Sequence, residues 1–334
     1  MKESKKKMTS IGGQAVLEGV MMRGPESSAI AVRKPDGSIV IKTNPTNSFV
    51  KRIGLAKIPI LRGVVSFFES MIVGVKATMY SAEFVDLESD EAEEPSKFDQ
   101  WLEKHFGEKL MPVIMWISVA FALVMSVGLF MLFPTVVAGF IKNLFTNETL
   151  VKFPQQFIDA VQGFFTNRIF LNLMEACVRI SLFALYMWAV SHMKDMQRVF
   201  AYHGAEHKVI ACYEDGAELT PENAKTYTRF HPRCGTNFLL IVMVMSILLF
   251  SVLTWDGVWI RILMRLALMP VVAGLSYEVI KLAGKSQNKC VKFLIRPGLA
   301  LQKFTTREPD ESQLEVAIAS LEAVLPKEEG ADNW

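Results

Sequence analysis

The sequence predicts a mainly α-helical, polytopic membrane protein with about four transmembrane helices, one interfacial helix and a small N-terminal cap that contains β-structure. The chain of 334 residues is 51% hydrophobic and 21% charged, and its mean hydropathy of +0.27 is unusual for a soluble domain and excludes a disordered chain. Residues 111–141 and 234–255 contain no charged side chain. Each stretch is long enough to cross about 30 Å of hydrocarbon, so an ordinary soluble enzyme is excluded.

The overall charge balance limits the partners that the protein can have. Because 36 basic residues are offset by 34 acidic ones, the chain has no strong positive field, and we expect no nucleic acid among its partners. The four cysteines form no CxxC pair, which argues against a secreted disulfide framework. The partner that the composition does predict is the lipid bilayer.

Residues 1–47 are predicted to form a small Gly-rich and β-hairpin module. Two runs rich in β-branched residues, 28–34 and 38–43, flank the turn sequence Pro35-Asp36-Gly37 and predict a β-hairpin. The stretch 11–24 is too interrupted by glycine to predict a helix. Its glycines favour close backbone packing; the alternative is that Glu18 and Arg23 line the functional site.

Residues 48–84 are predicted to include an amphipathic helix that lies in the membrane interface. From residue 59 to residue 84 the charged side chains Arg62, Glu69, Lys76 and Glu83 recur every seven residues, and nearly all residues between them are apolar. Charges spread along the whole helix favour an interfacial position over a spanning one. Residues 85–98 are expected to form an acidic linker, and residues 306–334 a C-terminal soluble helix, capped by Asp310, with a tail.

The membrane domain is predicted over residues 99–305. Its four helices are expected at 111–133, 169–192, 238–255 and 258–282, with a short amphipathic piece at 154–165. The loop 193–235 holds six basic residues, and five more follow the fourth helix within a short stretch. By the positive-inside rule, both termini and this loop face the cytoplasm, and we expect a multi-pass protein of the bacterial cytoplasmic membrane.

Three charged residues lie within the predicted spans. Glu175 and Arg179 are four residues apart on one helix, and Arg265 lies at a similar depth in another. A lone charge in the bilayer centre costs several kcal/mol, so we expect the three to neutralise one another inside the bundle. A buried ion cluster that fixes helix packing is favoured over a proton or substrate path.

The residues with the strongest metal-binding pattern lie in the loop 193–235. His203 and His207 are four residues apart, so a helix would place both imidazoles on one face, at a separation that suits one Zn²⁺. Glu206 directly precedes the second histidine and could act as a general base toward water. The order H-x-x-E-H is that of inverted zinc peptidases. The alternative is that these are interfacial histidines at a polar membrane surface.

A mononuclear zinc site needs a third protein ligand. The sequence offers four candidates: His231 ranks first, Glu278 second, Cys234 close behind, and Glu214 remains open. His231 and Cys234 precede the third helix, Glu214 lies seven residues after His207, and Glu278 lies near one end of the fourth helix.

Four segments of the chain resemble the YqhQ-like family of bacterial membrane proteins. These are GGQAVLEGVMMRGP, YHGAEHKVIACYE, HPRCGTNF and GLSYEVIKLAG, and the similarity extends over about residues 10–305. Members of the family are described as predicted metal-dependent enzymes, without an established substrate. The resemblance implies that one site contains residues 203, 206, 207, 231 and 234.

These observations predict a cytoplasm-facing, metal-dependent membrane enzyme. We expect zinc held by His203, His207 and either His231 or Glu278, with Glu206 as the general base. A hydrolase acting on a lipid-linked substrate or a membrane-protein segment fits a site at the membrane surface. The alternative is a non-catalytic membrane scaffold or transporter with a structural metal site.

Overall fold

The computed structural model describes residues 8–46, 57–84, 111–146, 167–253, 258–285 and 289–328, together with residue 54, residues 330–332 and a few positions between 156 and 163. The chain divides into two compact units. The sheet unit comprises Met1–Asp86, Met187–Ser246 and Met264–Trp334, and the helical unit comprises Leu87–Tyr186 and Ile247–Leu263.

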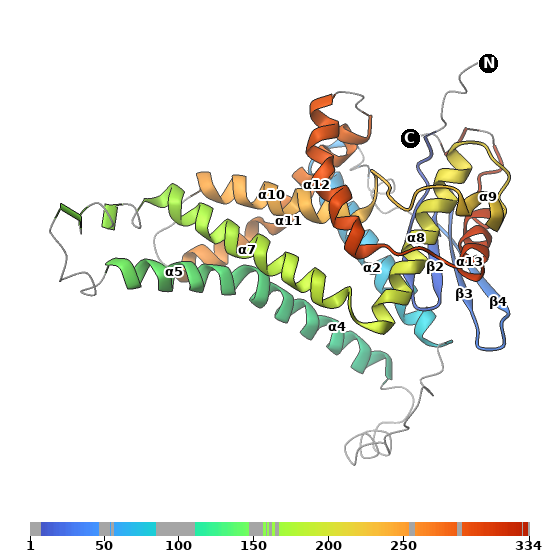
Figure 1. Ribbon diagram of the computed structural model, residues 1–334, viewed down its shortest axis with the longest axis horizontal. Coiled ribbons are helices and arrows are strands. Elements are labelled where there is room, and N and C mark those ends of the chain that lie inside the picture. Colours follow the sequence, from blue (N-terminus) through green and yellow to red (C-terminus); the bar gives the residue numbers. More distant parts are fainter. Residues whose placement is uncertain are drawn as a thin grey trace, which may run out of the picture. The chain divides into compact units, whose positions relative to one another are not determined.

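A four-stranded antiparallel sheet forms the N-terminal part of the sheet unit (Figure 1). The strands β1 (Gly12–Val16), β2 (Gly19–Arg23), β3 (Ser27–Arg33) and β4 (Ile39–Pro45) follow one another in chain order. The predicted hairpin is confirmed as β3–β4. The glycine-rich stretch before it forms a further hairpin, in which Val16 pairs with Gly19 across a turn where Glu18 has φ +49°.

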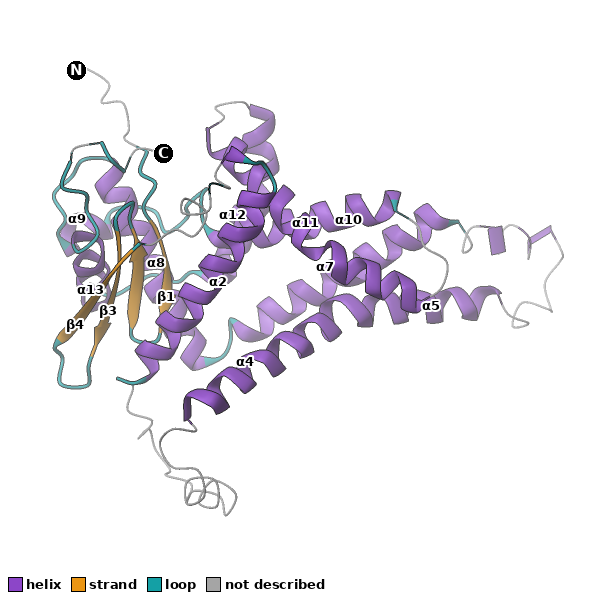
Figure 2. Cartoon of the chain, turned by 180° about the vertical axis from the view of Figure 1, so that it is seen from behind, coloured by secondary structure: helices purple, strands orange, loops and turns teal. Residues whose placement is uncertain are grey.

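One face of the sheet packs against two helices that come from distant parts of the sequence, α8 (Lys194–Glu214) and α13 (Glu311–Glu322) (Figure 2). The alternation of side chains along a strand places every second residue on this face. The buried cluster joins the strands to both helices. Its strand members include Val20, Met22, Ala29 and Ala31, and its helix members include Tyr202, Val209, Leu314 and Leu321.

The other face of the sheet packs against α2 (Leu61–Ala82), whose Ala77 belongs to one buried cluster with Val16, Met21 and Val32. The helix predicted over residues 59–84 is therefore present. Its charged stripe forms ion pairs within the sheet unit, because Glu69 pairs with Arg23 of β2, and Arg62 pairs with Glu278 of α11 (Val258–Lys285). Its position in the membrane interface stays a prediction.

The C-terminal helix α13 belongs to the core of the sheet unit. The predicted cap is confirmed, since Asp310 and Gln313 form a reciprocal capping box. The helix is not separate from the rest of the sheet unit, because Leu314 and Leu321 are fully buried in the cluster that joins α8 to the sheet. Burial of the apolar face of α13 stabilises the fold because it removes apolar surface from water. The amphipathic pattern in the sequence shows that such a face exists, but not which element covers it.

The segment 193–235 is largely structured. It consists of α8, the short helix α9 (Pro221–Lys225) and a connection that leads into α10 (Gly235–Val252). The amphipathic helix α12 (Lys289–Thr305) follows α11 and ends beside α8, where the amide of Arg307 donates to the carbonyl of Phe200. These elements position the candidate site.

Four helices are long and apolar enough to cross a membrane: Trp116–Leu144, Phe170–Val190, Gly235–Val252 and Trp259–Ala283. The predicted multi-pass fold is thus confirmed by length and composition. The first span was expected to end near Pro134 but continues beyond it, from α4 (Met111–Val127) through a π-helical turn, η3 (Gly128–Leu132), into α5 (Phe133–Thr146). A wider turn before a proline relieves the clash of its ring with the preceding helical turn.

The helical unit contains the predicted ion pair on α7 (Arg168–Val190). The carboxylate of Glu175 accepts hydrogen bonds from Arg179 and from the hydroxyl of Thr135 on α5, both at 3.0 Å. Arg265 is buried as well; its pairing with these residues stays a prediction. The expected acidic linker 85–98 and most of the amphipathic piece 154–165 lie outside the described residues.

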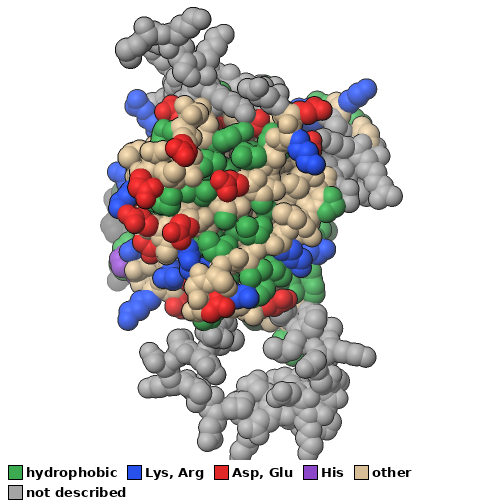
Figure 3. Space-filling view, turned by 90° about the vertical axis from the view of Figure 1, so that its right-hand side faces the viewer, with side chains coloured by type: hydrophobic (Ala, Val, Ile, Leu, Met, Phe, Trp, Pro, Cys, Tyr) green, Lys and Arg blue, Asp and Glu red, His purple; other side chains and the backbone are tan. Residues whose placement is uncertain are grey.

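The surface of the sheet unit carries both signs of charge. Seen from the side of α9 and α13, acidic and basic side chains are interspersed with apolar ones (Figure 3). This mixture agrees with the net charge of +2. The surface charge on this face therefore does not mark a functional site, and the charged side chains that stand out in this unit are buried ones.

Candidate metal centre

Helix α8 carries three of the predicted site residues into the core beneath β1. His203 is half-buried, while Glu206 and His207 are 5% and 1% exposed. The nearby residues Ala205 and Val209 of the same helix are fully buried against the sheet. The helical spacing brings the two imidazoles together as predicted, with ring centroids 4.4 Å apart.

Backbone carbonyls fix the protonation of both imidazoles. Nδ1 of His203 lies 2.8 Å from the carbonyl oxygen of Thr305, and Nδ1 of His207 lies 2.6 Å from that of Arg229. A carbonyl oxygen can only accept, so each Nδ1 carries a proton, and in the neutral imidazole it is Nε2 that presents the lone pair. This arrangement is the one by which proteins orient histidine as a metal ligand.

Cys234 supplies the third donor of the group. Its Sγ lies 3.1 Å from Nε2 of His203, and the ligand atoms of His203, His207 and Cys234 all lie within 4.8 Å of one another. Tetrahedral zinc with bonds of about 2.0–2.3 Å separates its ligands by roughly 3.3–3.8 Å. A small adjustment, which lengthens the 3.1 Å distance and shortens any that approach 4.8 Å, would therefore let the three atoms share one ion.

Cys234 lies at the start of a helix, beside two hydrogen-bond donors. The residue immediately precedes α10, and the amide and hydroxyl of Thr236 lie 3.5 and 3.3 Å from its Sγ. These contacts fix the position of the sulfur next to the histidines. A cysteine binds metal through this atom.

Two buried polar atoms at the site have no hydrogen-bond partner among the described residues, Nε2 of His207 and Oε2 of Glu206. Leaving a buried acceptor unsatisfied costs about 1–3 kcal/mol. A ligand at this position would remove that cost. The donor set and the unsatisfied nitrogen together fit a divalent ion.

The carboxyl group of Glu206 lies next to the group formed by His203, His207 and Cys234, called the metal group. Its Oε1 accepts a hydrogen bond from the amide of Gly13 in β1 at 3.0 Å. Gly13 permits this close approach, because a Cβ atom there would lie 2.5 Å from the carbonyl oxygen of Met21 and 3.2 Å from Cδ of Glu206. Burial raises the pKa of Glu206, although His203 and the Gly13 amide act in the opposite direction.

A cavity of about 320 Å³ adjoins the group. Backbone of β1 and residues of β2 and α2 form one side, and α8 and the start of α10 form the other. The polar side chains that line it include Arg23, Glu206, His207, His231, Arg233 and Cys234. Of the two N-terminal residues weighed from the sequence, Arg23 thus lies at the site, whereas Glu18 pairs with Arg198.

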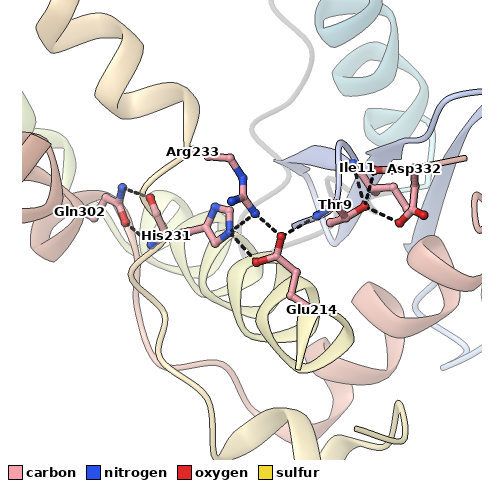
Figure 4. A network of polar contacts seen from close by, with 7 residues as sticks. All are labelled: Thr9, Ile11, Glu214, His231, Arg233, Gln302 and Asp332. Carbon is pink, nitrogen blue, oxygen red and sulfur yellow. Dashed lines mark hydrogen bonds and ion pairs between the residues drawn. The ribbon is translucent and has the colours of Figure 1, made fainter. Parts of the chain in front are cut away.

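His231, the first-ranked third ligand, lies beside the group but has other partners (Figure 4). Its ring centroid is 5.5 Å from that of His207, and its Nε2 lies 3.4 Å from Arg233 and 3.8 Å from a carboxylate oxygen of Glu214. Its backbone amide and carbonyl both bond to the side chain of Gln302 at 2.8 Å. Burial lowers the pKa of His231, against the opposing effect of Glu214.

Glu214 is the centre of a satisfied polar network (Figure 4). It accepts hydrogen bonds from the guanidinium of Arg233 and from the amide of Thr9, at 2.8 Å for the amide. Burial alone would raise the pKa of Glu214, but His231, Arg233 and the Thr9 amide outweigh it and lower the pKa. The hydroxyl of Thr9 donates in turn to Asp332 at 2.7 Å, which joins the two ends of the chain.

Glu278, ranked second as the third ligand, lies outside the three-residue group. Both of its carboxylate oxygens accept hydrogen bonds from Arg62 of α2, with a distance of 2.7 Å to Nε. The structure therefore gives Glu278 a partner on another helix. Among the described residues, the donors brought together are His203, His207 and Cys234.

The family of the chain follows from comparison with known proteins. A family model described as "Protein of unknown function (DUF1385)" matches residues 58–327. The chain belongs to this family. It is also 35% identical over 320 residues to "Uncharacterized protein YqhQ" of Bacillus subtilis (strain 168), which covers 94% of this chain and 92% of that protein. No solved structure matches the chain.

These findings confirm the family resemblance seen in the sequence motifs. The functional groups that sequence reasoning missed are backbone atoms: the Thr305 and Arg229 carbonyls and the Gly13 amide. Backbone groups leave no residue pattern, so no sequence signal could have found them. Cys234 could be proposed from the sequence, because a cysteine directly before an apolar helix is well placed to bind metal.

Proposed function

We propose that the protein is a membrane-embedded, metal-dependent hydrolase in which His203, His207 and Cys234 hold one divalent ion. The observation that carries the proposal is the lone pair on Nε2 of His207. This nitrogen is buried and has no hydrogen-bond partner among the described residues. The ligand atoms of His203, His207 and Cys234 all lie within 4.8 Å of one another.

Zinc suits this donor set best. Two neutral imidazoles and one thiolate are borderline and soft ligands, which favour Zn²⁺ over the oxygen-preferring Mg²⁺ and Ca²⁺. When bound, the ion would supply a Lewis acid that activates water and polarises a carbonyl or phosphoryl oxygen.

Three protein donors favour a catalytic site over a structural one. Structural zinc sites have four protein ligands, whereas catalytic sites keep one position open. The best fourth donor, His231, has its Nε2 within 3.4 Å of Arg233 and 3.8 Å of Glu214. The cavity lined by His207 and Cys234 offers room for a substrate instead.

Glu206 is the residue that would accept and return a proton. The Gly13 amide anchors its Oε1, while Oε2 has no partner among the described residues and belongs to a side chain that lines the cavity. A buried carboxyl group with a raised pKa holds its proton more readily than an exposed one, as general acid–base catalysis requires.

The location of the group supports a substrate at the membrane surface. Cys234 directly precedes the candidate span Gly235–Val252, and α8 begins four residues after the span Phe170–Val190 ends. A lipid-linked molecule or a membrane-protein segment could reach a site at this depth. With both termini cytoplasmic, as the distribution of basic residues predicts, the site would face the cytoplasm.

Metal analysis of the detergent-purified protein tests the proposal. We expect about one zinc per chain in the wild type and less than a tenth of that in His203→Ala, since the loss of a ligand lowers zinc affinity by well over tenfold. His192→Ala is the matched control, because His192 is exposed and bonds to the carbonyl of Trp188 at 2.7 Å. Equal metal content in all three proteins would refute the assignment.

The distance of 3.1 Å between His203 and Cys234 also fits a second function, a cysteine nucleophile with a histidine base. That function leaves the unsatisfied Nε2 of His207 unexplained. It predicts a metal-free protein with a Cys234 thiol that reacts rapidly with iodoacetamide and slowly in His203→Ala. The metal proposal predicts instead that chelation is needed before Cys234 reacts.

A further inference from the structure

The cavity beside the metal group is lined by more positive than negative charge. Among the described residues that line it, Arg23 and Arg233 bring two guanidinium groups, and Glu206 brings one carboxyl group. The remaining lining comprises His207, His231 and Cys234, together with backbone, small polar side chains and apolar side chains. Such a surface favours an anionic ligand.

Each of the two arginines forms an ion pair with a carboxylate that does not line the cavity. Arg23 of β2 pairs with Glu69 of α2, whose side chain is 14% exposed, and Arg233 pairs with Glu214 of α8, whose side chain is 7% exposed. An arginine fixed in this way loses little side-chain entropy when it binds a ligand. The guanidinium fork matches the oxygens of a phosphoryl group or a carboxylate.

Two further features of the cavity wall point to a bound ligand, the first to an anion and the second to the proposed cation beside it. Gly235, the first residue of the 18-residue helix α10, lines the cavity, so the positive end of that helix dipole lies there. Nε2 of His207, on a side chain that is 1% exposed, has no partner among the described residues and belongs to the same wall. The second feature is independent of the helix and indicates a missing ligand.

We propose that the cavity binds a phosphoryl group, with Arg23 and Arg233 as the residues that position it next to the metal group. The inference rests on the proposed function and names the substrate class of that site. Glu69 and Glu214 balance the charge of the two arginines, so the preference for phosphate comes from geometry: two guanidinium forks, a helix N-terminus and a divalent ion can together bind several anionic oxygens. This suits the three free oxygens of a phosphate monoester better than the two of a carboxylate. The volume of about 320 Å³ admits a phosphoryl headgroup, since a water molecule takes up roughly 30 Å³.

Isothermal titration of the zinc-loaded, full-length protein in detergent tests the inference. The probes are inorganic phosphate, glycerol phosphate, acetate, and phosphatidic acid in mixed micelles. We expect phosphate to bind the wild type and to bind Arg23→Gln at least about tenfold more weakly, the effect of about 1.4 kcal/mol that a charge-assisted hydrogen bond provides. Arg23→Lys, which keeps the charge and can still pair with Glu69, is expected to lie between them.

The matched control is Arg198→Gln. Arg198 is also held by a glutamate, Glu18, but does not line the cavity, so its variant should bind phosphate as the wild type does. If Arg23→Gln fails to fold, as judged by circular dichroism, Arg23→Lys and Arg198→Gln still decide the comparison.

The probes distinguish the source of the phosphoryl group. Binding of inorganic phosphate or glycerol phosphate supports a soluble phosphate ester, and binding of phosphatidic acid alone supports a lipid headgroup. Absence of binding by all phosphates, equal binding of acetate, or equal affinities in Arg23→Gln and Arg198→Gln would overturn the inference. Zinc content, measured on the same samples, separates this failure from a failure of the metal site, because Arg23→Gln should keep its zinc.

Discussion

Two buried polar clusters lie close together in the sheet unit and differ in how their hydrogen bonds are satisfied. In the cluster around Glu214, the carboxylate is bonded to Arg233 and Thr9. In the cluster around His207, the Nε2 of that histidine and Oε2 of Glu206 have no partner among the described residues. A satisfied network stabilises a fold, whereas unsatisfied buried atoms indicate a ligand. The difference assigns a structural role to the carboxylate of Glu214 and a ligand to the cluster around His207.

The largest effect is expected from Glu214→Ala, which would remove the buried carboxylate that pairs with the guanidinium of Arg233. Breaking one member of a buried ion pair costs about 3–5 kcal/mol. Hydrogen exchange of the sheet-unit amides in detergent should show this loss. The control is Glu315→Ala, whose side chain is 51% exposed and pairs with Arg33; a surface pair contributes at most about 1 kcal/mol. Equal effects of the two substitutions would remove the structural role of the Glu214 cluster.

Removal of metal should destabilise the sheet unit through the other cluster. A ligand at a hundred times its dissociation constant stabilises the folded state by about 2.7 kcal/mol. We expect a chelator to lower the melting temperature of the wild type and of Cys212→Ser, but to change that of Cys234→Ser little. Both cysteines are buried, so the pair controls for the loss of sulfur. A chelator effect in Cys234→Ser as large as in the wild type would exclude Cys234 as a ligand.

Acidification should weaken the Glu214 cluster. The pKa of Glu214 is lowered from 4.5 and that of His231 from 6.5, so the unfolded chain takes up protons first and folding stability falls as the pH drops below about 6.5 and again below about 4.5. The amides of residues 9–16, measured by hydrogen exchange, should lose protection over this range. In Glu214→Gln the lower step should vanish; if it persists unchanged, another carboxylate is responsible.

The smallest effect on stability is expected for Glu206→Gln. The amide keeps the acceptor for the Gly13 amide and adds no buried charge, so the free energy of unfolding should change by less than about 1 kcal/mol. Zinc content should stay at the wild-type level, while turnover of a substrate, or complementation of a deletion strain, should be lost. Retained turnover would exclude Glu206 as the general base and leave the metal site intact.

Periodicity and local chemistry in the sequence were sufficient for several elements. The four spans follow from long uncharged stretches, the β3–β4 hairpin from its turn sequence, and the proximity of His203 and His207 from a spacing of one helical turn. The first hairpin was not predicted, because Gly13 and Gly19 interrupt the strand pattern. Gly19 is nevertheless required by the pairing, since a Cβ there would lie 2.2 Å from the carbonyl oxygen of Ala31.

By itself, the sequence determined that the protein is a membrane protein with a pair of imidazoles suited to metal, since both properties depend on residues near one another in the chain. Only the tertiary structure decided which distant groups meet them. It brought Cys234 to the histidines and paired Glu278 with Arg62 and His231 with Glu214. It also placed α13 in the core. Contacts between distant segments depend on the packing of the whole sheet unit, which no local pattern specifies.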